Sequence, residues 1–505
     1  MNFAKALLDC PASPDKIALY TQQGEVSFRD LQTDARNFGQ LLLARGLKPG
    51  DRVLLAGDSS LFWVAAYLGI SLAGGVSVPV AVPANETFLG DVIQATEPRF
   101  AFVQAKWLRR MGTLLDGIDL IISDARPPRL SGDFELITIS EAAGNLAPGP
   151  MPDRSSGDLA SIMFTSGSTA TPRGVMVSNG NILANTEDII TSLEIGPDDR
   201  IMAVLPFHYC FGTSLLHTHL LAGASLVIDN RFLFPEKVLQ NMVDSHCTSL
   251  AGVPSTYQIL LRRSNLKKME FPHLVKLQQA GGKLAQAFID ELESTLPNAR
   301  LYVMYGQTEA TARLSCISPE DRRAHPGSIG KGLARVSLDV HAESGHPVKV
   351  GEIGEIIARG PNITAGYWQN PEATERIFSN GLHTGDLATV DDDGFIIIVD
   401  RARDFLKCGG KRVSCRQIEE TLVNFEGLSE VAVVGMPDLV LGEAVCLFAV
   451  HPDGAAIEER LKEFCEKELD HILLPRKVVF LEELPKNNSG KPDKLKLKST
   501  LKTDD

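Results

Sequence analysis

The chain has 505 residues, which predicts two or more domains, because a single hydrophobic core rarely grows to that size. Apolar residues make up 44% of the chain and charged residues 22%, as in globular proteins, which excludes a disordered, fibrous or small disulfide-stapled protein. The net charge of −13 argues against a general affinity for nucleic acid or for an anionic membrane surface.

The first 16 residues contain an apolar stretch that is too short for a secretory signal and soon meets Asp9 and Pro11. The eight cysteines form no CxxC pair and no Cys/His cluster with the spacing of metal ligands. We therefore expect reduced thiols, no export and a cytoplasmic protein.

Residues 61–82 carry no charge over a length that could cross a bilayer. Gly74, Gly75 and Pro79 divide this segment, and the residues after the glycine pair are typical of a turn that enters a buried strand. The segment is therefore predicted to be a buried helix, a turn and a buried strand rather than a membrane span.

Helical patterns alternate with short apolar runs through the first 330 residues, beginning with a helical pattern at 27–46. The apolar runs lie at 51–57, 199–206, 224–229, 274–282 and 299–306. Such alternation predicts an α/β domain of mostly parallel sheets covered by helices. In open sheets of this kind, ligands bind at the carboxyl ends of the strands.

From about residue 330 the sequence changes to short strands and tight turns, which predicts a β-rich subdomain over about 330–400. A boundary is expected near residue 404, followed by a small α+β unit. The predicted organisation is thus an N-terminal domain of residues 1–403 and a C-terminal domain of residues 404–505.

The stretch MFTSGSTATPRGVMVS, residues 163–178, places small hydroxylated residues and glycine between two apolar runs. Hydroxyl and backbone N–H donors with little bulk suit polyphosphate oxygens, and Arg173 adds a charge that can hold two of those oxygens. The predicted phosphate-contacting residues are Thr165, Ser166, Gly167, Ser168, Thr169 and Arg173. The stretch lacks the G-x-x-x-x-G-K-[ST] pattern, so a P-loop kinase is disfavoured.

Four further motifs follow this loop in order: YGQTEA at 305–310, HTGDLATVDDDGF at 383–395, DRARDFLKCGGKRVSCRQIEE at 400–420 and LPKNNSGKPDK at 484–494. Together the five resemble the adenylate-forming superfamily of acyl-CoA synthetases, stand-alone adenylation domains and beetle luciferases. The resemblance extends from about residue 17 to residue 500. It implies an enzyme that activates a carboxylic acid with ATP and Mg²⁺ and then passes the acyl group to a thiol.

The resemblance also implies roles for individual residues. Lys491 matches the catalytic lysine that bridges the substrate carboxylate and the α-phosphate, which is where two anions must meet. Glu309 matches the residue that helps to hold Mg²⁺, with Thr165 as a second Mg²⁺ contact and Thr308 as a phosphate contact. His208 is also predicted to be catalytic, in a stretch that resembles the aromatic gate of family members that take acyl and aryl acids.

Other implied positions surround the nucleoside and the thiol. Tyr305 and Gly306 match the motif that stacks on adenine, and Gly281, Gly282 and Lys283 match the loop on the other face of the base. Asp386 and Arg401 match the pair that binds the ribose hydroxyls. Asp404 corresponds to a hinge of a mobile C-terminal domain, and Lys407 and Gly410 lie in the thiol-transfer loop.

The chain departs from the family pattern at several positions without losing a catalytic group. Ala170 replaces glycine, Arg173 replaces lysine, Asp400 replaces glycine, Arg403 replaces lysine and Cys415 replaces proline. We expect these changes to affect the rate and the position of the second-step loop.

The motif LPFHYCFG at 205–212 lacks the aspartate that pairs with an α-amine in peptide-synthetase adenylation domains. A fatty or other aliphatic acid without an α-amino group is therefore favoured, and an aryl or amino acid is the alternative. The chain holds no carrier domain, so the acceptor is coenzyme A or the phosphopantetheine of a separate carrier protein. A non-catalytic acyl or nucleotide sensor and a luciferase-like oxygenase remain as other classes.

Overall fold

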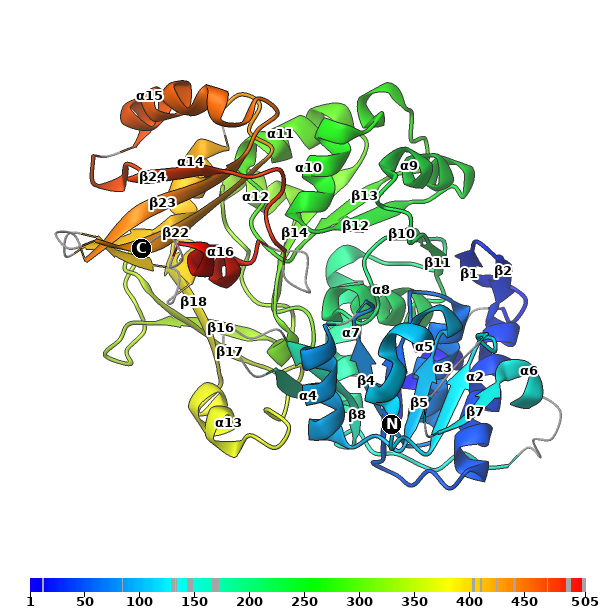
Figure 1. The fold of residues 1–505 in the computed structure, drawn as a ribbon. Helices are drawn as coiled ribbons and strands as arrows, with labels where there is room; N and C mark the ends of the chain where they lie inside the picture. Colours follow the sequence, from blue (N-terminus) through cyan, green and yellow to red (C-terminus); the bar gives the residue numbers. More distant parts are fainter. Residues whose placement is uncertain are drawn as a thin grey trace.

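The computed structural model spans residues 1–505, and the residues that it describes are all except 11–12, 84, 129–131, 133, 143–148, 166–171, 402–404, 409–410, 424, 439–441, 470, 487–491 and 502–505. Side chains of some further residues, Arg401 and Lys407 among them, are likewise outside the description. The α/β class that the alternating pattern predicts is confirmed: two large, mostly parallel sheets are followed by two smaller sheets (Figure 1).

The first large sheet has the strand order β7-β6-β5-β3-β4-β8-β9, and its strands pair in parallel except for β8 with β9. Its strands are β3 (Arg52–Ala56), β4 (Val76–Val80), β5 (Phe100–Val103), β6 (Leu120–Ser123), β7 (Glu135–Thr138), β8 (Leu159–Thr165) and β9 (Arg173–Ser178). The antiparallel pair β8–β9 places Thr165 directly opposite Arg173. The two ends of the predicted phosphate loop therefore lie side by side.

The second large sheet has the order β15-β14-β13-β12-β10-β11-β1-β2 and is antiparallel only at its two outer pairs. Its strands are β1 (Ile17–Thr21), β2 (Gly24–Ser27), β10 (Arg200–Ala203), β11 (Ser225–Ile228), β12 (Ser249–Gly252), β13 (Lys276–Gln279), β14 (Arg300–Tyr305) and β15 (Ser315–Ile317). The carboxyl ends of β12, β13 and β14 consequently lie at one edge of the sheet.

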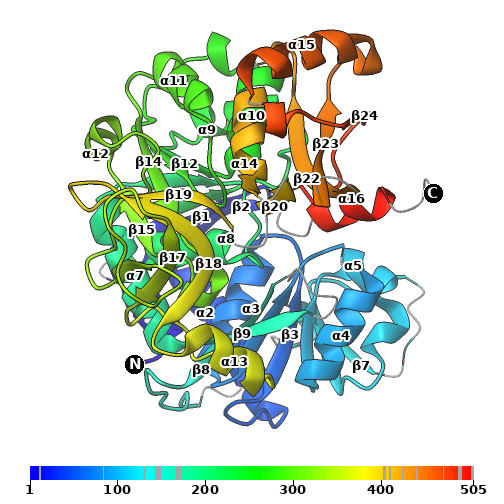
Figure 2. The same ribbon diagram turned by 90° about the vertical axis from the view of Figure 1, so that its left-hand side faces the viewer.

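Helices cover the two large sheets (Figures 1 and 2). They are α1 (Phe3–Leu8), α2 (Phe28–Ala44), α3 (Leu61–Leu72), α4 (Glu86–Thr96), α5 (Ala105–Met111), α6 (Ile139–Ala142), α7 (Asn179–Leu193), α8 (Cys210–Leu221), α9 (Pro235–Asp244), α10 (Pro254–Arg263), α11 (Gln286–Thr295) and α12 (Pro319–Ala324), with the 3-10 turns η1 (Gly112–Leu115), η2 (Leu266–Lys268) and η3 (Thr308–Ala310). A further helix, α13 (Pro371–Phe378), packs against β18 of the β-rich subdomain. Tyr67 of α3 and His217 of α8 hydrogen bond at 3.1 Å in the core that the sheets share.

The uncharged segment 61–82 forms α3 and β4, as predicted, with Gly74 at φ +82° in the turn between them. Nearly every residue of α3 is buried, because the helix lies inside the protein and has no solvent-facing side. Among the helices in the described part of the chain, none is both long and apolar enough to cross a bilayer.

The β-rich subdomain is one antiparallel sheet of β16 (Ser337–His341), β17 (Gly354–Arg359), β18 (Leu382–Val390) and β19 (Ile396–Arg401). The final sheet contains β20 (Phe405–Cys408), β21 (Lys411–Ser414), β22 (Glu430–Asp438), β23 (Gly442–Val450) and β24 (Lys477–Phe480). It is accompanied by α14 (Cys415–Leu422), η4 (Gly454–Ile457), α15 (Glu458–Glu468), η5 (His471–Leu473) and α16 (Lys494–Thr500). This last unit has its own apolar cores and lies beside α10 and α11 (Figures 1 and 2).

Candidate active site

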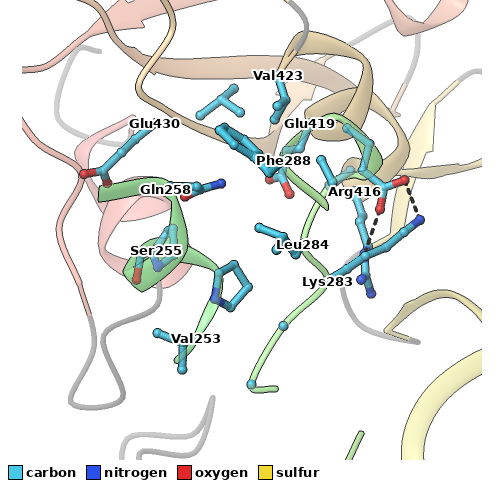
Figure 3. Close-up of a pocket in the computed structure, with 18 of the residues that line it drawn as sticks. Val253, Ser255, Gln258, Lys283, Leu284, Phe288, Arg416, Glu419, Val423 and Glu430 are labelled. Atoms are coloured by element: carbon cyan, nitrogen blue, oxygen red, sulfur yellow. Dashed lines mark hydrogen bonds and ion pairs between the residues drawn. The ribbon is translucent and has the colours of Figure 1, made fainter. Parts of the chain in front are cut away.

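A cavity of 1130 Å³ lies between the carboxyl ends of β12, β13 and β14 and the C-terminal unit (Figure 3). Val253, after β12, and Ser255, at the start of α10, line it from one side, and Arg416 and Glu419 line it from α14. Six of the predicted nucleotide-binding residues also line it: Gly281, Gly282, Lys283, Tyr305, Gly306 and Asp386. The cavity is large enough for a nucleotide-sized ligand.

Tyr305 and Asp386 come from different sheets and meet in the wall of this cavity. The Tyr305 hydroxyl donates to Asp386 Oδ2 at 2.6 Å, and the two residues are only 9% and 4% exposed. Asp386 also faces Arg401 across the β18–β19 ladder. The predicted adenine-stacking residue and the predicted ribose pair are thus neighbours, although the Arg401 side chain lies outside the described part.

Two glycines at this edge have a steric reason to be glycine. Gly281 has φ +86°, and a Cβ atom there would lie 2.9 Å from Val253 Cγ1. A Cβ atom on Gly306 would lie 2.0 Å from the backbone oxygen of Ala312, which no rearrangement of a side chain could relieve. The backbone of the loop after β14 therefore passes close to Gly306 at Ala312 and leaves no room for a side chain there.

Glu309, in the turn after β14, is held by residues that follow the β-rich subdomain's second strand. The Tyr367 hydroxyl donates to Glu309 Oε1 at 2.8 Å, and both the amide and the hydroxyl of Thr364 donate to the Glu309 backbone oxygen at 3.0 Å. The Arg173 guanidinium lies 5.5 Å from the Tyr367 ring centroid. Burial and the Glu309 charge raise the pKa of Tyr367, so its hydroxyl stays protonated and donates.

Thr308 and His208 lie near the N-terminus of α8. The Thr308 hydroxyl lies 3.5 Å from Cys210 Sγ, the first residue of that helix. Burial, opposed by the negative charge of Asp58, lowers the pKa of His208 to about 4. His208 is therefore a neutral imidazole at physiological pH and can offer a hydrogen bond but no positive charge.

The donor set suits a Mg²⁺ ion that arrives with nucleotide phosphates. Among the described residues, no group of three or more His, Cys, Asp or Glu side chains is placed to hold a metal. Mg²⁺ keeps most of its ligands from phosphates and water and needs only one or two protein oxygens. Glu309 offers a carboxylate and Thr165 a hydroxyl, so the residues present fit such an ion.

Several predicted residues fall outside the described part of the chain. They are Ser166, Gly167, Ser168, Thr169, Asp404, Gly410 and Lys491, and for Lys407 only the backbone is described, in the β20–β21 hairpin opposite Arg412. Their assigned roles remain predictions.

The structure adds three residues to which the motifs assigned no role. Tyr367 contacts Glu309, Glu420 pairs with Lys283 at 2.7 Å, and Arg313 is buried close to α8. The first two depend on contacts between segments far apart in the sequence, which no local pattern records. The sequence carries a weak signal for Arg313, because it is the single charged residue among residues 310–318.

Comparison with known proteins agrees with this geometry. AMP-binding enzymes match residues 9–368, and the AMP-binding enzyme C-terminal domain matches residues 417–491. The chain therefore belongs to the AMP-binding enzyme family. It is an AMP-forming acid–thiol ligase of the adenylate-forming superfamily, which confirms the class that the five motifs predict.

Individual relatives cover almost the whole chain. The long-chain-fatty-acid–CoA ligase of Salmonella typhimurium is 32% identical and the match covers 94% of this chain and 90% of that protein. The 2-succinylbenzoate–CoA ligase of Geobacillus is 26% identical over 97% of this chain and 95% of its own. The crystal structure of ATP-bound MatB from Rhodopseudomonas palustris superimposes with a TM-score of 0.87 at 29% identity, over 99% of both chains.

Proposed function

We propose that this enzyme activates an aliphatic carboxylic acid without an α-amino group and transfers the acyl group to coenzyme A. The observation that carries the proposal is the arrangement at the end of β14. Tyr305, Thr308 and Glu309 lie on one loop, and Asp386 is hydrogen-bonded to the first of them. This arrangement offers a nucleoside subsite beside a phosphate subsite at the strand ends.

In the first step, a carboxylate oxygen of the acid attacks the α-phosphorus of ATP. A new oxygen–phosphorus bond forms, the bond to the bridging oxygen breaks, and pyrophosphate leaves with the acyl-adenylate as the other product. Both reactants are anions, so fixed positive charge lowers the barrier. Arg173 and Lys491 are proposed to supply it, and Mg²⁺ held with ATP by Glu309 and Thr165 would neutralise phosphate charge.

The absence of an α-amino group is inferred from His208. An α-ammonium group would need a carboxylate partner, and a neutral imidazole cannot serve as one. Asp58 is the acid whose charge acts on His208, but it is already ion-paired with Lys106. An amino acid therefore remains the less favoured substrate.

The named relatives support an aliphatic acid as the substrate and coenzyme A as the acceptor. They include ligases for long-chain fatty acids and for 2-succinylbenzoate, so an aryl acid is the second candidate. The two ligases named here from Salmonella typhimurium and Geobacillus act on coenzyme A by name, which favours it over a carrier protein. For the second step, we propose that the domain beginning near Asp404 rotates and brings Lys407 and Gly410 to the site.

A panel of carboxylic acids, assayed for pyrophosphate release with and without coenzyme A, tests the proposal. Rapid turnover on adding coenzyme A supports it, whereas accumulation of the adenylate favours a carrier protein. No release with any acid would favour a sensor, and oxygen consumption or light would indicate a luciferase-like oxygenase.

The role of Lys491 is tested separately. Lys491→Ala is expected to slow adenylation by roughly two to three orders of magnitude, as when a charge-stabilising donor is removed from other active sites. Lys467→Ala, which removes an exposed lysine of α15, serves as the control and should leave the rate unchanged. Near-normal adenylation by Lys491→Ala would refute the assignment.

A further inference from the structure

Arg313 is a buried arginine without an anionic partner. It is 2% exposed, its Nε donates to Met304 Sδ at 3.2 Å, and its guanidinium carbon lies 3.9 Å from the Phe211 ring centroid. No carboxylate of any described residue lies within ion-pair distance of this guanidinium. The N–H groups on Nη1 and Nη2 therefore lack acceptors within the described part of the chain.

Comparison with another buried arginine shows how unusual this is. Arg322 is 4% exposed, but it pairs with Glu293 at 2.6 Å. An unpaired buried charge is costly, and an aromatic face and a thioether compensate for it only in part. Burial lowers the pKa of Arg313 to about 10, so the group still carries its charge at neutral pH.

The backbone holds Arg313 firmly in place. Its N–H donates to Asn185 Oδ1 at 3.1 Å, and its carbonyl accepts from the side-chain amides of Asn185 and Asn362, each at 2.8 Å. Leu314 N–H closes the loop by donating to the Tyr305 carbonyl at 2.8 Å. Arg313 is thus a fixed part of the loop that carries Thr308 and Glu309.

The Arg313 side chain lies against the N-terminal end of α8, which the loop carrying Thr308 and Glu309 also contacts. Phe211 stacks on Arg313, and Tyr209 and Cys210 lie close enough to influence its charge. Thr308 approaches the same Cys210. Thr308 and the Arg313 guanidinium, which belong to one loop, therefore both approach the first two residues of α8.

We propose that Arg313 binds a second carboxylate on the acid substrate, at the end of the chain remote from the carboxyl group that is adenylated. This inference rests on the proposed function of the same site. Two parallel N–H donors of a guanidinium match the two oxygens of a carboxylate, and the bound anion would supply the partner that the fold does not. The enzyme should accordingly prefer α,ω-dicarboxylic acids to monocarboxylic acids of equal length.

The test compares matched mono- and dicarboxylic acids over a series of chain lengths, with pyrophosphate release as the assay. At the best length, the wild type should show a kcat/KM about 10- to 100-fold higher for the diacid, the range expected for a charge-assisted hydrogen-bonded pair. Arg313→Met should abolish this preference through a raised KM for the diacid. Arg313→Lys, which keeps the charge but not the bidentate geometry, should fall between the two.

Arg200→Met is the matched control. Arg200 also stacks on an aromatic ring, 4.3 Å from the centroid of Tyr20, but it lies at the amino end of β10 and its side chain donates to the Ser245 carbonyl. Its loss should lower stability without changing the preference between the acids. Wild-type preference for monoacids at every length, or equal losses for both acids in Arg313→Met, would overturn the proposal.

Calorimetric binding of the unreacted acids separates this inference from the proposed function. If the wild type binds diacids but does not turn them over, and Arg313→Met abolishes this binding, the proposed ligase function is wrong and the role of Arg313 is supported. If the wild type turns over acids without any preference for diacids, the role of Arg313 is wrong and the proposed ligase function is unaffected.

Discussion

Lys283 and Glu420 form an ion pair of 2.7 Å across 137 residues of chain, joining the loop after β13 to α14 of the C-terminal unit. Arg416 holds the other oxygen of the same carboxylate at 3.1 Å, as the dashed lines in Figure 3 show. The pair bridges the two walls of the cavity. The position of the C-terminal unit therefore depends in part on a charge interaction that salt can screen.

Glu420→Lys is expected to replace this attraction with repulsion and to weaken the contact between the two walls. Because the pair is about one-third exposed, we expect a change of less than about tenfold in the rate of adenylation. The double variant Lys283→Glu/Glu420→Lys should recover only part of the lost rate, because Arg416 then faces a lysine in place of the Glu420 carboxylate. Equal behaviour of the single and double variants would show that the two side chains are not coupled.

Tyr367→Phe removes the hydroxyl that fixes Glu309. We expect about 10-fold slower adenylation and a higher Mg²⁺ requirement, with an unchanged KM for the acid, because one oxygen of Glu309 loses its donor. Tyr67→Phe is the control, since it removes a buried tyrosine hydroxyl that hydrogen bonds to His217 and not, within the described residues, to Glu309. A normal Mg²⁺ dependence in Tyr367→Phe would contradict a positioning role.

Asp386→Asn is expected to raise the KM for ATP about 10- to 100-fold, because the carboxylate would no longer accept strongly from Tyr305 and from a ribose hydroxyl. Tyr305→Phe removes only the first of these contacts and should have a smaller effect. Steady-state kinetics with ATP and acid varied separately will distinguish the two. A KM for ATP within twofold of the wild type in Asp386→Asn would exclude the nucleoside role.

Two histidines of α8 should make the protein less stable in mild acid. Burial lowers the pKa of His217 to about 3 and that of His219 to about 4 from an ordinary value of 6.5, and Asp199 and Lys276 act on His219 in opposite directions. The unfolded chain binds these protons first as the pH falls. The free energy of unfolding is therefore unaffected by these two histidines above about pH 6.5. It falls as the pH drops below that value, down to about pH 4 for His219 and about pH 3 for His217.

At about pH 5 each of these histidines should cost about 2 kcal/mol of the free energy of unfolding relative to neutral pH. Urea denaturation at the two pH values measures this loss. His219→Gln should reduce the loss of unfolding free energy between the two pH values by the contribution of that one histidine. His273→Gln, which changes a surface histidine, should leave the loss unchanged. An unaltered pH dependence in His219→Gln would contradict the assignment.

The sequence predicted the elements more fully than it predicted their contacts. The segment 61–82 could be assigned correctly because Gly74, Gly75 and Pro79 interrupt it, which is a local signal. Likewise, the apolar run predicted at 299–306 is the strand β14, which ends at Tyr305. The pairing of Glu420 with Lys283 and that of Tyr367 with Glu309 could not be predicted, because each joins segments far apart in the sequence and arises only through tertiary packing.

The hydrogen bond between Leu314 and Tyr305 closes a short ring of backbone with the nucleoside side at one end and Arg313 at the other. Thr311, at φ +66°, bends that ring through a conformation that a side-chain-bearing residue rarely adopts. Because backbone and asparagine hydrogen bonds already close this ring, its conformation is set before either substrate arrives, and neither substrate has to order it on binding.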